Sequence, residues 1–213
     1  MRRIAVSQRR DAIAGRDETR DALDVRLGGL LWNLGFLPIP LCSAIASARR
    51  NATEDARAAA EYLDALAPES IVLSGGNDIG QAPERDNLEH AALAYARLHR
   101  VPVLGICRGM QMIHVHQGGE LVLQTGHVAV AHTVTGEWLG EGRRTVNSYH
   151  NQGVPGDALG AELEPLACAE DGSVEALRHC HLPWLGIMWH PERDTPTAEA
   201  DQKLIKNHLG ARL

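Results

Sequence analysis

The residues around Cys107 have the spacing of a nucleophile held at a sharp turn. The run Gly105-Ile106-Cys107-Arg108-Gly109 ends an apolar stretch that predicts a buried strand, and a helical pattern follows. A Gly-x-nucleophile-x-Gly turn needs its glycines because the backbone and neighbouring elements come close together there. The turn exposes the thiol at a helix N-terminus, whose partial positive charge favours the thiolate. This pattern is typical of a cysteine that attacks a carbonyl carbon, although taken alone it also fits a buried structural cysteine.

A proton carrier, and a group to orient it, follow another apolar stretch. His190 and Glu192 come directly after residues 184–189, which predict a buried strand. In an extended segment, residues two apart project from the same side, so the carboxylate can hold the imidazole toward Cys107. A lone histidine at a strand end is most often an ordinary loop residue. Paired with a cysteine at a turn, it is predicted to be the acid–base group of a nucleophilic reaction.

A third motif supplies donors for the oxyanion that such a reaction forms. Gly75 and Gly76 follow residues 70–74, which predict a further buried strand. The backbone N–H groups of Gly76 and of Arg108, the residue after the nucleophile, can therefore point into one crevice at the sheet end. A Gly-Gly turn is weak evidence on its own, and its place after a strand is what favours this role.

The three motifs require strands that end at one edge of a sheet, and the sequence supplies them. Strands are expected at residues 4–7, 36–41, 70–74, 101–106 and 184–189, and helices at residues 23–34, 53–66, 86–99 and 197–209. This alternation predicts an α/β fold with a mostly parallel central sheet flanked by helices and joined by right-handed crossovers. Residues 120–169 hold short alternating runs and many turn residues, which predict a small antiparallel insertion decorating one side of the core. We expect residues 1–213 to form a single domain whose site lies at the carboxyl ends of the strands.

Composition narrows the class of protein. The 213 residues carry 21 Lys+Arg against 27 Asp+Glu, a net charge of -6, which argues against binding nucleic acid through its phosphates. No apolar run reaches the length of a membrane span, and the first residues predict a strand rather than a signal peptide. Cys42, Cys107, Cys168 and Cys180 are scattered without a CxxC pair, which fits reduced thiols in a cytoplasmic protein. No role is predicted for the three cysteines other than Cys107.

The histidines do not predict a metal centre. His114 and His116 are two apart on a helix and face different sides, which is poor geometry for a shared ligand. The run His179-Cys180-His181 adjoins a turn, while His127 and His132 fall in the irregular insertion. We therefore expect neither a catalytic metal nor a cofactor.

Together the motifs resemble the class I glutamine amidotransferases, and within them the stand-alone γ-glutamyl hydrolases of peptidase C26 type. The resemblance spans nearly the whole chain and rests on residues 74–78, 105–111, 146–152, 171–176 and 189–192. It implies a flavodoxin-like fold, a Cys107–His190–Glu192 triad that forms a glutamyl-thioester, and an oxyanion hole at Gly76 and Arg108. It also implies that the substrate contacts Gly75, Asn77, Gln111, Asn147, Ser148, Tyr149 and His150.

A narrower resemblance, at residues 6–9, 20–24, 36–41 and 186–193, is to the bacterial hydrolases of γ-glutamyl-CDP-amidate. Those enzymes release glutamate and cytidine diphosphoramidate for capsule phosphoramidate synthesis. Arginines bind diphosphate well, and Arg9 and Arg10 lie just after the first predicted strand. We expect one of them to contact the leaving group, the alternative being a solvated arginine cluster. Residues 79–86 lack the longer loop of the branch that acts on γ-glutamyl-GABA, which argues against that substrate.

Other functions stay open at this point. The chain is an alternative candidate for a hydrolase of γ-glutamyl-GABA or another γ-glutamyl amine, or for a glutaminase subunit that supplies ammonia to a separate synthetase. A non-catalytic binding protein on the same fold is the third alternative. The partner expected is a small-molecule γ-glutamyl amide, with no nucleic acid and no membrane, and homodimer formation is left open.

Overall fold

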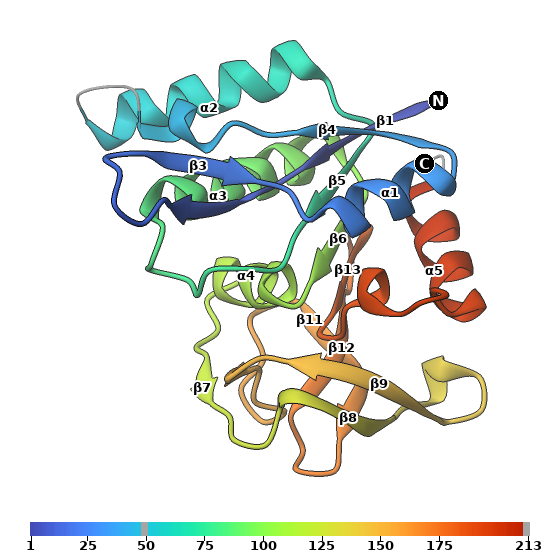
Figure 1. Ribbon diagram of the computed structural model, residues 1–213. Helices are drawn as coiled ribbons and strands as arrows, with labels where there is room; N and C mark the ends of the chain where they lie inside the picture. The colour runs from blue at the N-terminus through green and yellow to red at the C-terminus, as the bar shows by residue number, and fades with distance from the viewer. Residues whose placement is uncertain (48–50, 211–213) are drawn as a thin grey trace.

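The computed structural model describes residues 1–47 and 51–210 and is built on a nine-stranded sheet (Figure 1). The strand order is β4-β1-β5-β6-β13-β12-β11-β8-β9. The first five strands are parallel: β1 (Arg2–Val6), β4 (Phe36–Pro40), β5 (Ser70–Leu73), β6 (Val103–Ile106) and β13 (Trp184–Ile187). Every residue of β5, β6 and β13 is buried, as expected of strands with both faces covered. Counted along the chain, these strands lie in the order 2-1-3-4-5, so the predicted flavodoxin-like fold is confirmed.

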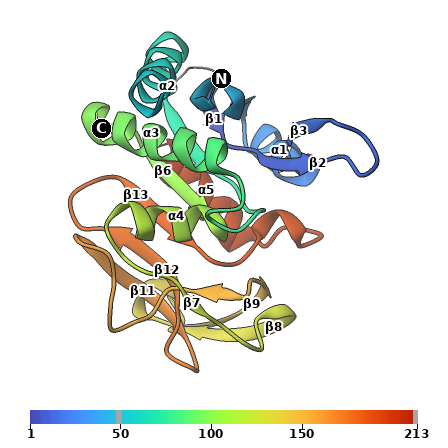
Figure 2. The same cartoon turned by 90° about the vertical axis from the view of Figure 1, so that its left-hand side faces the viewer.

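Helices cover both faces of this parallel half. The five α-helices are α1 (Val25–Asn33), α2 (Ala52–Leu66), α3 (Pro83–His99), α4 (Arg108–His116) and α5 (Glu199–Gly210). Helices α2, α3 and α4 lie on one face and α1 and α5 on the other, as Figures 1 and 2 show from two sides. Asp24 caps the first turn of α1 by accepting a hydrogen bond from the Arg26 N–H (2.9 Å). Three short 3-10 helices complete the set: η1 (Ser43–Ser47), η2 (Glu137–Leu139) and η3 (Pro191–Arg193).

The predicted antiparallel insertion is present, but it extends the main sheet. Four antiparallel strands follow β13 in the strand order: β12 (Val174–His179), β11 (Leu163–Ala169), β8 (Val128–Thr135) and β9 (Arg143–Tyr149). The short strands β7 (Val122–Leu123) and β10 (Gln152–Gly153) form a separate two-stranded sheet. Because a short turn joins β12 to β13, the two strands pair directly and carry the insertion into the plane of the parallel sheet.

A hairpin follows β1 that the sequence pattern does not predict. Strands β2 (Arg9–Ala12) and β3 (Thr19–Ala22) pair with each other and project from the body of the molecule (Figure 2). Their sequences, RRDA and TRDA, lack the alternation of apolar residues that marks a half-buried strand. The hairpin matters because it begins at the carboxyl end of β1, on the side where the site is expected.

Two further observations bear on the composition. Within the described ranges, no helix is both long and apolar enough to cross a lipid bilayer. All four cysteines are free: Cys107 is buried, Cys168 is half-buried, and Cys42 and Cys180 are exposed.

Candidate active site

The three predicted motifs meet at the carboxyl ends of β5, β6 and β13. They border a cavity of roughly 370 Å³ whose wall includes Gly76, Cys107, Arg108, Gln111 and His190. A second cavity of roughly 230 Å³ shares Gly76 and His190 with the first and continues toward α1 and the β2–β3 hairpin. The sheet edge therefore carries one crevice with two compartments around His190.

The turn at Cys107 is strained and closely packed. Its backbone has φ 51° and ψ −106°, in a region that L-residues other than glycine rarely adopt. A Cβ on Gly105 would lie 2.5 Å from the carbonyl carbon of Gly109, and one on Gly109 would lie 2.0 Å from the carbonyl oxygen of Leu73. The N–H of Cys107 donates to the Ile187 carbonyl (2.8 Å), which ties the turn to β13. Close approach of the backbone is thus why glycine stands on both sides of the cysteine.

His190 is held from two directions and is protonated at neutral pH. Its Nδ1–H donates to Glu192 Oε1 (2.7 Å), and its backbone N–H donates to Asn147 Oδ1 (2.9 Å). Burial on its own would lower the pKa of His190, but hydrogen bonds and charge interactions with Cys107 and Glu192 outweigh burial and raise it to about 9. An imidazolium beside a cysteine sulfur stabilises the thiolate. Cys107 and His190 can therefore act together, as a nucleophile with a proton donor beside it.

The glycine loop after β5 packs directly on the imidazole. A Cβ on Gly75 would lie only 2.7 Å from His190 Cε1. Gly76 has φ +121°, and a Cβ there would lie 2.7 Å from the Arg9 Cβ. Gly76 and Arg108, whose N–H groups were expected to bind the oxyanion, both border the cavity that holds Cys107.

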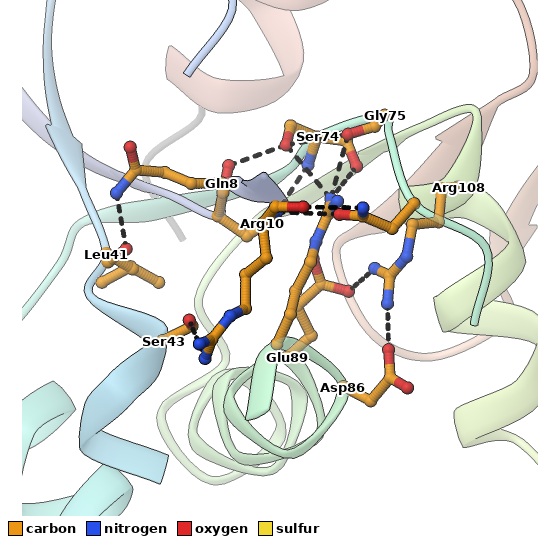
Figure 3. A network of polar contacts seen from close by, with 12 residues as sticks. Gln8, Arg10, Leu41, Ser43, Ser74, Gly75, Asp86, Glu89 and Arg108 are labelled. Carbon is orange, nitrogen blue, oxygen red and sulfur yellow. Dashed lines mark hydrogen bonds and ion pairs between the residues drawn. The ribbon is translucent and has the colours of Figure 1, made fainter. Parts of the chain in front are cut away.

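A buried ion network lies behind this loop and the cysteine turn (Figure 3). The Arg108 guanidinium pairs with Asp86 and Glu89 of α3. Glu89 also accepts from Arg85 Nε (2.9 Å), and Arg85 Nη2 donates to the Ser74 carbonyl (2.6 Å). Burial would raise the pKa of Glu89, but the two guanidinium groups lower it, so the carboxylate stays charged. Through α3, the network connects the loop after β5 to the turn after β6, which are the two segments that carry the expected oxyanion donors.

Several predicted substrate residues do reach the cavity. Asn77, Tyr149, His150 and Arg9 all border the compartment that contains Cys107. Gln111 also borders it, and its Nε2 donates to a backbone carbonyl of β10 (2.8 Å). The compartment therefore presents amide, hydroxyl and imidazole groups to a bound molecule.

Other predicted contacts are committed elsewhere in the fold. Arg10 turns away from the cavity, donating to Ser43 Oγ (3.2 Å) and pairing with Glu84 (3.4 Å), as Figure 3 shows for Ser43. The Asn147 amide does not line the cavity but binds the backbone of His190, donating to its carbonyl and accepting from its N–H. Ser148 is fully buried and donates to a backbone carbonyl (2.7 Å). These three side chains stay out of the cavity because each is bonded to a residue far away in the sequence.

Arg193 is a cation in the crevice that the motif analysis does not assign to the site. It borders both compartments, and its guanidinium carbon lies 4.3 Å from the centre of the Tyr149 ring. Its Nε is buried and has no hydrogen-bond partner in the described part of the chain. By contrast, Arg9 is already paired with Asp11 (2.7 Å). The one available signal in the sequence is that Arg193 directly follows the His-Pro-Glu run.

Comparisons with known proteins show the family and the fold. The sequence matches the peptidase C26 family over residues 51–192. It is 32% identical over 131 residues to the γ-glutamyl-CDP-amidate hydrolase of Campylobacter jejuni, a match that covers 59% of this chain and 62% of that protein, less than two thirds of its length. It is 31% identical over 139 residues to the carbamoyl phosphate synthase small chain of Staphylococcus haemolyticus, covering 62% of this chain and 36% of that one. A glutamine amidotransferase structure from Thermotoga maritima is 14% identical and has a TM-score of 0.62 over 98% of this chain and 84% of its own, which shows a shared fold.

Proposed function

Because the chain belongs to the peptidase C26 family, we propose that it hydrolyses a γ-glutamyl amide through a thioester on Cys107. The observation that carries this proposal is the position of Cys107 at a strained strand–helix turn, in one cavity with His190, whose imidazole Glu192 orients. An amidohydrolase needs a nucleophile, a proton donor and oxyanion donors within one cavity. The proposal is supported by one cavity that Cys107, His190, Gly76 and Arg108 all border.

In the first half of the reaction, the Cys107 thiolate attacks the γ-carbonyl carbon. The carbonyl oxygen becomes an oxyanion and accepts from the backbone N–H groups of Gly76 and Arg108. His190 Nε2 gives its proton to the leaving nitrogen, the C–N bond breaks, and the amine departs. Because interactions with Cys107 and Glu192 raise the pKa of His190, the imidazole holds a proton for the leaving nitrogen.

In the second half, water hydrolyses the thioester. His190, now neutral, takes a proton from the water as its oxygen attacks the thioester carbon. The C–S bond breaks, glutamate leaves, and the thiolate–imidazolium pair is restored. Glu192 accepts from Nδ1 throughout and so keeps Nε2 directed at the reacting atoms.

The leaving group that we propose is cytidine diphosphoramidate, released from γ-glutamyl-CDP-amidate. Arg193 supports an anionic substrate, because it borders the crevice and its buried Nε has no hydrogen-bond partner among the described residues. Arg9 borders the same compartment. Leu23 and Leu27 give that compartment an apolar wall suited to a base. The similarity to the Campylobacter jejuni hydrolase supports the same choice.

Three substrates offered side by side test the proposal. Glutamine, γ-glutamyl-GABA and γ-glutamyl-CDP-amidate would be compared by the rate of glutamate release. We expect the nucleotide amidate to have a kcat/KM about 100-fold or more above the other two, since charge-assisted contacts to phosphate contribute about 1.5–3 kcal/mol each. Equal rates on all three would refute the nucleotide leaving group. Release that persists in Cys107→Ala would refute the thioester.

Arg193→Met separates recognition of the leaving group from recognition of the glutamyl part. If Arg193 contacts the diphosphate, the variant should lose at least tenfold in kcat/KM on the nucleotide amidate and little on glutamine. A parallel loss on all substrates would place the guanidinium at the glutamyl carboxylate. Arg10→Met is the matched control, because Arg10 points to Ser43 and should leave every rate unchanged.

A further inference from the structure

A second cluster of titratable side chains is buried in the antiparallel half of the sheet. Glu175 on β12 has no exposed surface, and three imidazoles surround its carboxylate. Glu175 Oε1 lies 3.5 Å from His127 Nδ1 and 3.4 Å from His150 Nε2, while Oε2 lies 3.4 Å from His132 Nε2. Within the described residues, none of these five polar atoms has a hydrogen-bond partner. Such a group of orphaned atoms in one place requires an explanation.

A β-bulge brings two of the histidines to the same side. His127 and His132 are five residues apart, and an odd spacing in a regular strand places side chains on opposite faces. The pairing of β8 with β9 shifts register between Val128 and Val130, and Ala129 between them has φ 56°. The extra residue of the bulge reverses the alternation, so both rings face Glu175. The ring centres of His127 and His132 are 4.7 Å apart.

The outer hydrogen bonds of two rings determine which nitrogens are unprotonated. His150 Nδ1 lies 2.9 Å from the Gln152 carbonyl, which can only accept, so Nδ1 carries the proton. His127 Nε2 lies 2.9 Å from the Asp171 carboxylate and donates to it in the same way. In the neutral rings, the inner nitrogens therefore present lone pairs to Glu175. Lone pairs facing a carboxylate repel unless a cation lies between them.

The distances distinguish a metal ion from a proton. A charge-assisted N–H···O bond is about 2.7–2.9 Å long, shorter than the 3.4–3.5 Å between Glu175 and each imidazole. A tetrahedral Zn²⁺ with bonds of about 2.0–2.1 Å separates neighbouring ligand atoms by about 3.3–3.4 Å. The candidate ligand atoms of His127, His132 and Glu175 all lie within 4.8 Å of one another. The hydrogen bond from His127 to Asp171 is an outer contact of the kind that orients a histidine ligand.

We propose that His127 Nδ1, His132 Nε2 and Glu175 bind one Zn²⁺ ion that stabilises this part of the fold, with His150 beside Glu175 but outside the set of ligands. Nitrogen and carboxylate ligands of this kind suit zinc. With three protein ligands the ion would leave its fourth position to water, and because none of the three borders the compartment that contains Cys107, its role is structural. The sequence predicts no metal. With a zinc ion in this cluster, that prediction would apply to the reaction but not to the protein as a whole.

The ion would act on the substrate crevice through Glu175, whose Oε1 lies 3.4 Å from His150 Nε2. His150 borders the compartment containing Cys107, and its Nδ1 binds the same Gln152 carbonyl that accepts from Gln111. Joining β8, β9 and β12 at one point would hold this wall of the crevice in place. The inference does not depend on which γ-glutamyl amide the protein hydrolyses.

Metal content tests the proposal directly. The full chain, produced without a histidine tag in zinc-supplemented medium, would be analysed by inductively coupled plasma mass spectrometry. We expect about one zinc per chain, and less than about 0.1 in Glu175→Gln and His132→Gln, because each substitution removes a ligand. His99→Gln, which changes an exposed histidine at the end of α3, is the matched control and should retain the full content. Repeating the measurement in Cys107→Ala excludes zinc held by the thiolate.

A thermal measurement gives a second readout that is independent of activity. Removing the metal with a chelator and returning Zn²⁺ should raise the Tm of the wild type and of His99→Gln, but not that of Glu175→Gln. If the wild type holds less than about 0.1 zinc per chain and added Zn²⁺ leaves its Tm unchanged, the proposal is wrong and protons occupy the cluster. Because both readouts are independent of hydrolysis, that result would leave the proposed function untouched. If the variants do not fold, the wild-type stoichiometry alone decides.

Discussion

Gly75 determines how far the His190 imidazole can extend toward the glycine loop. Replacing it with alanine would put a Cβ 2.7 Å from His190 Cε1, whereas ordinary contacts begin near 3.4 Å. The ring must therefore retreat by about 0.7 Å, or the loop must move by as much. The ring's Nδ1 is hydrogen-bonded to Glu192 Oε1 at 2.7 Å, so the displacement would strain the bond that orients the base. Because a misplacement of about 1 Å can cost about 100-fold, we expect kcat/KM to fall about 30-fold in Gly75→Ala.

The assay is steady-state glutamate release across a pH series, with circular dichroism to confirm folding. Displacing the imidazole disturbs its interactions with Cys107 and Glu192, which raise the pKa of His190, so the alkaline limb of the profile should shift to lower pH. The matched control is Gly29→Ala in α1, where a Cβ would meet nothing within 4 Å. It should keep full activity and gain about 0.5–1 kcal/mol of stability. A folded Gly75→Ala protein within threefold of the wild type, with an unshifted limb, would refute the reasoning.

Two further outcomes follow from the charges around the site. The kcat/KM of the wild type should decline above about pH 9, where His190 loses the proton that the leaving nitrogen needs. Glu192→Gln should move this decline to lower pH, because it removes a negative charge that raises the pKa of His190. An alkaline limb that does not move in this variant would show that another group controls the decline. Glu89→Gln would leave the buried Arg85 and Arg108 guanidinium groups without their shared carboxylate, so urea denaturation should show a loss of about 3–5 kcal/mol, and a change below about 1 kcal/mol would show that the network does not stabilise the fold.

The sequence alone predicts those features of this protein that depend on residues close together along the chain. Glycines on both sides of Cys107 predict the sharp turn, because the requirement for small residues acts over a few positions. The pairing of His190 with Glu192 is also local, but Glu192 lies in the 3-10 helix η3 and not in the extended segment that the sequence pattern predicts. Apolar runs separated by helical patterns predict the parallel sheet, and that sheet brings the three motifs together at its carboxyl edge.

Only the tertiary structure decides where side chains from distant strands point. Arg9 and Arg10 are adjacent in the sequence, yet only Arg9 borders the crevice, because Arg10 pairs with Ser43 and Glu84. The histidine cluster depends on one bulge at Ala129, which reverses the alternation of β8 and is not marked by residue type. Periodicity and turn chemistry are encoded in neighbouring residues. Register shifts and ion-pair choices depend on contacts between segments that are far apart along the chain, so they are determined only when the sheet assembles.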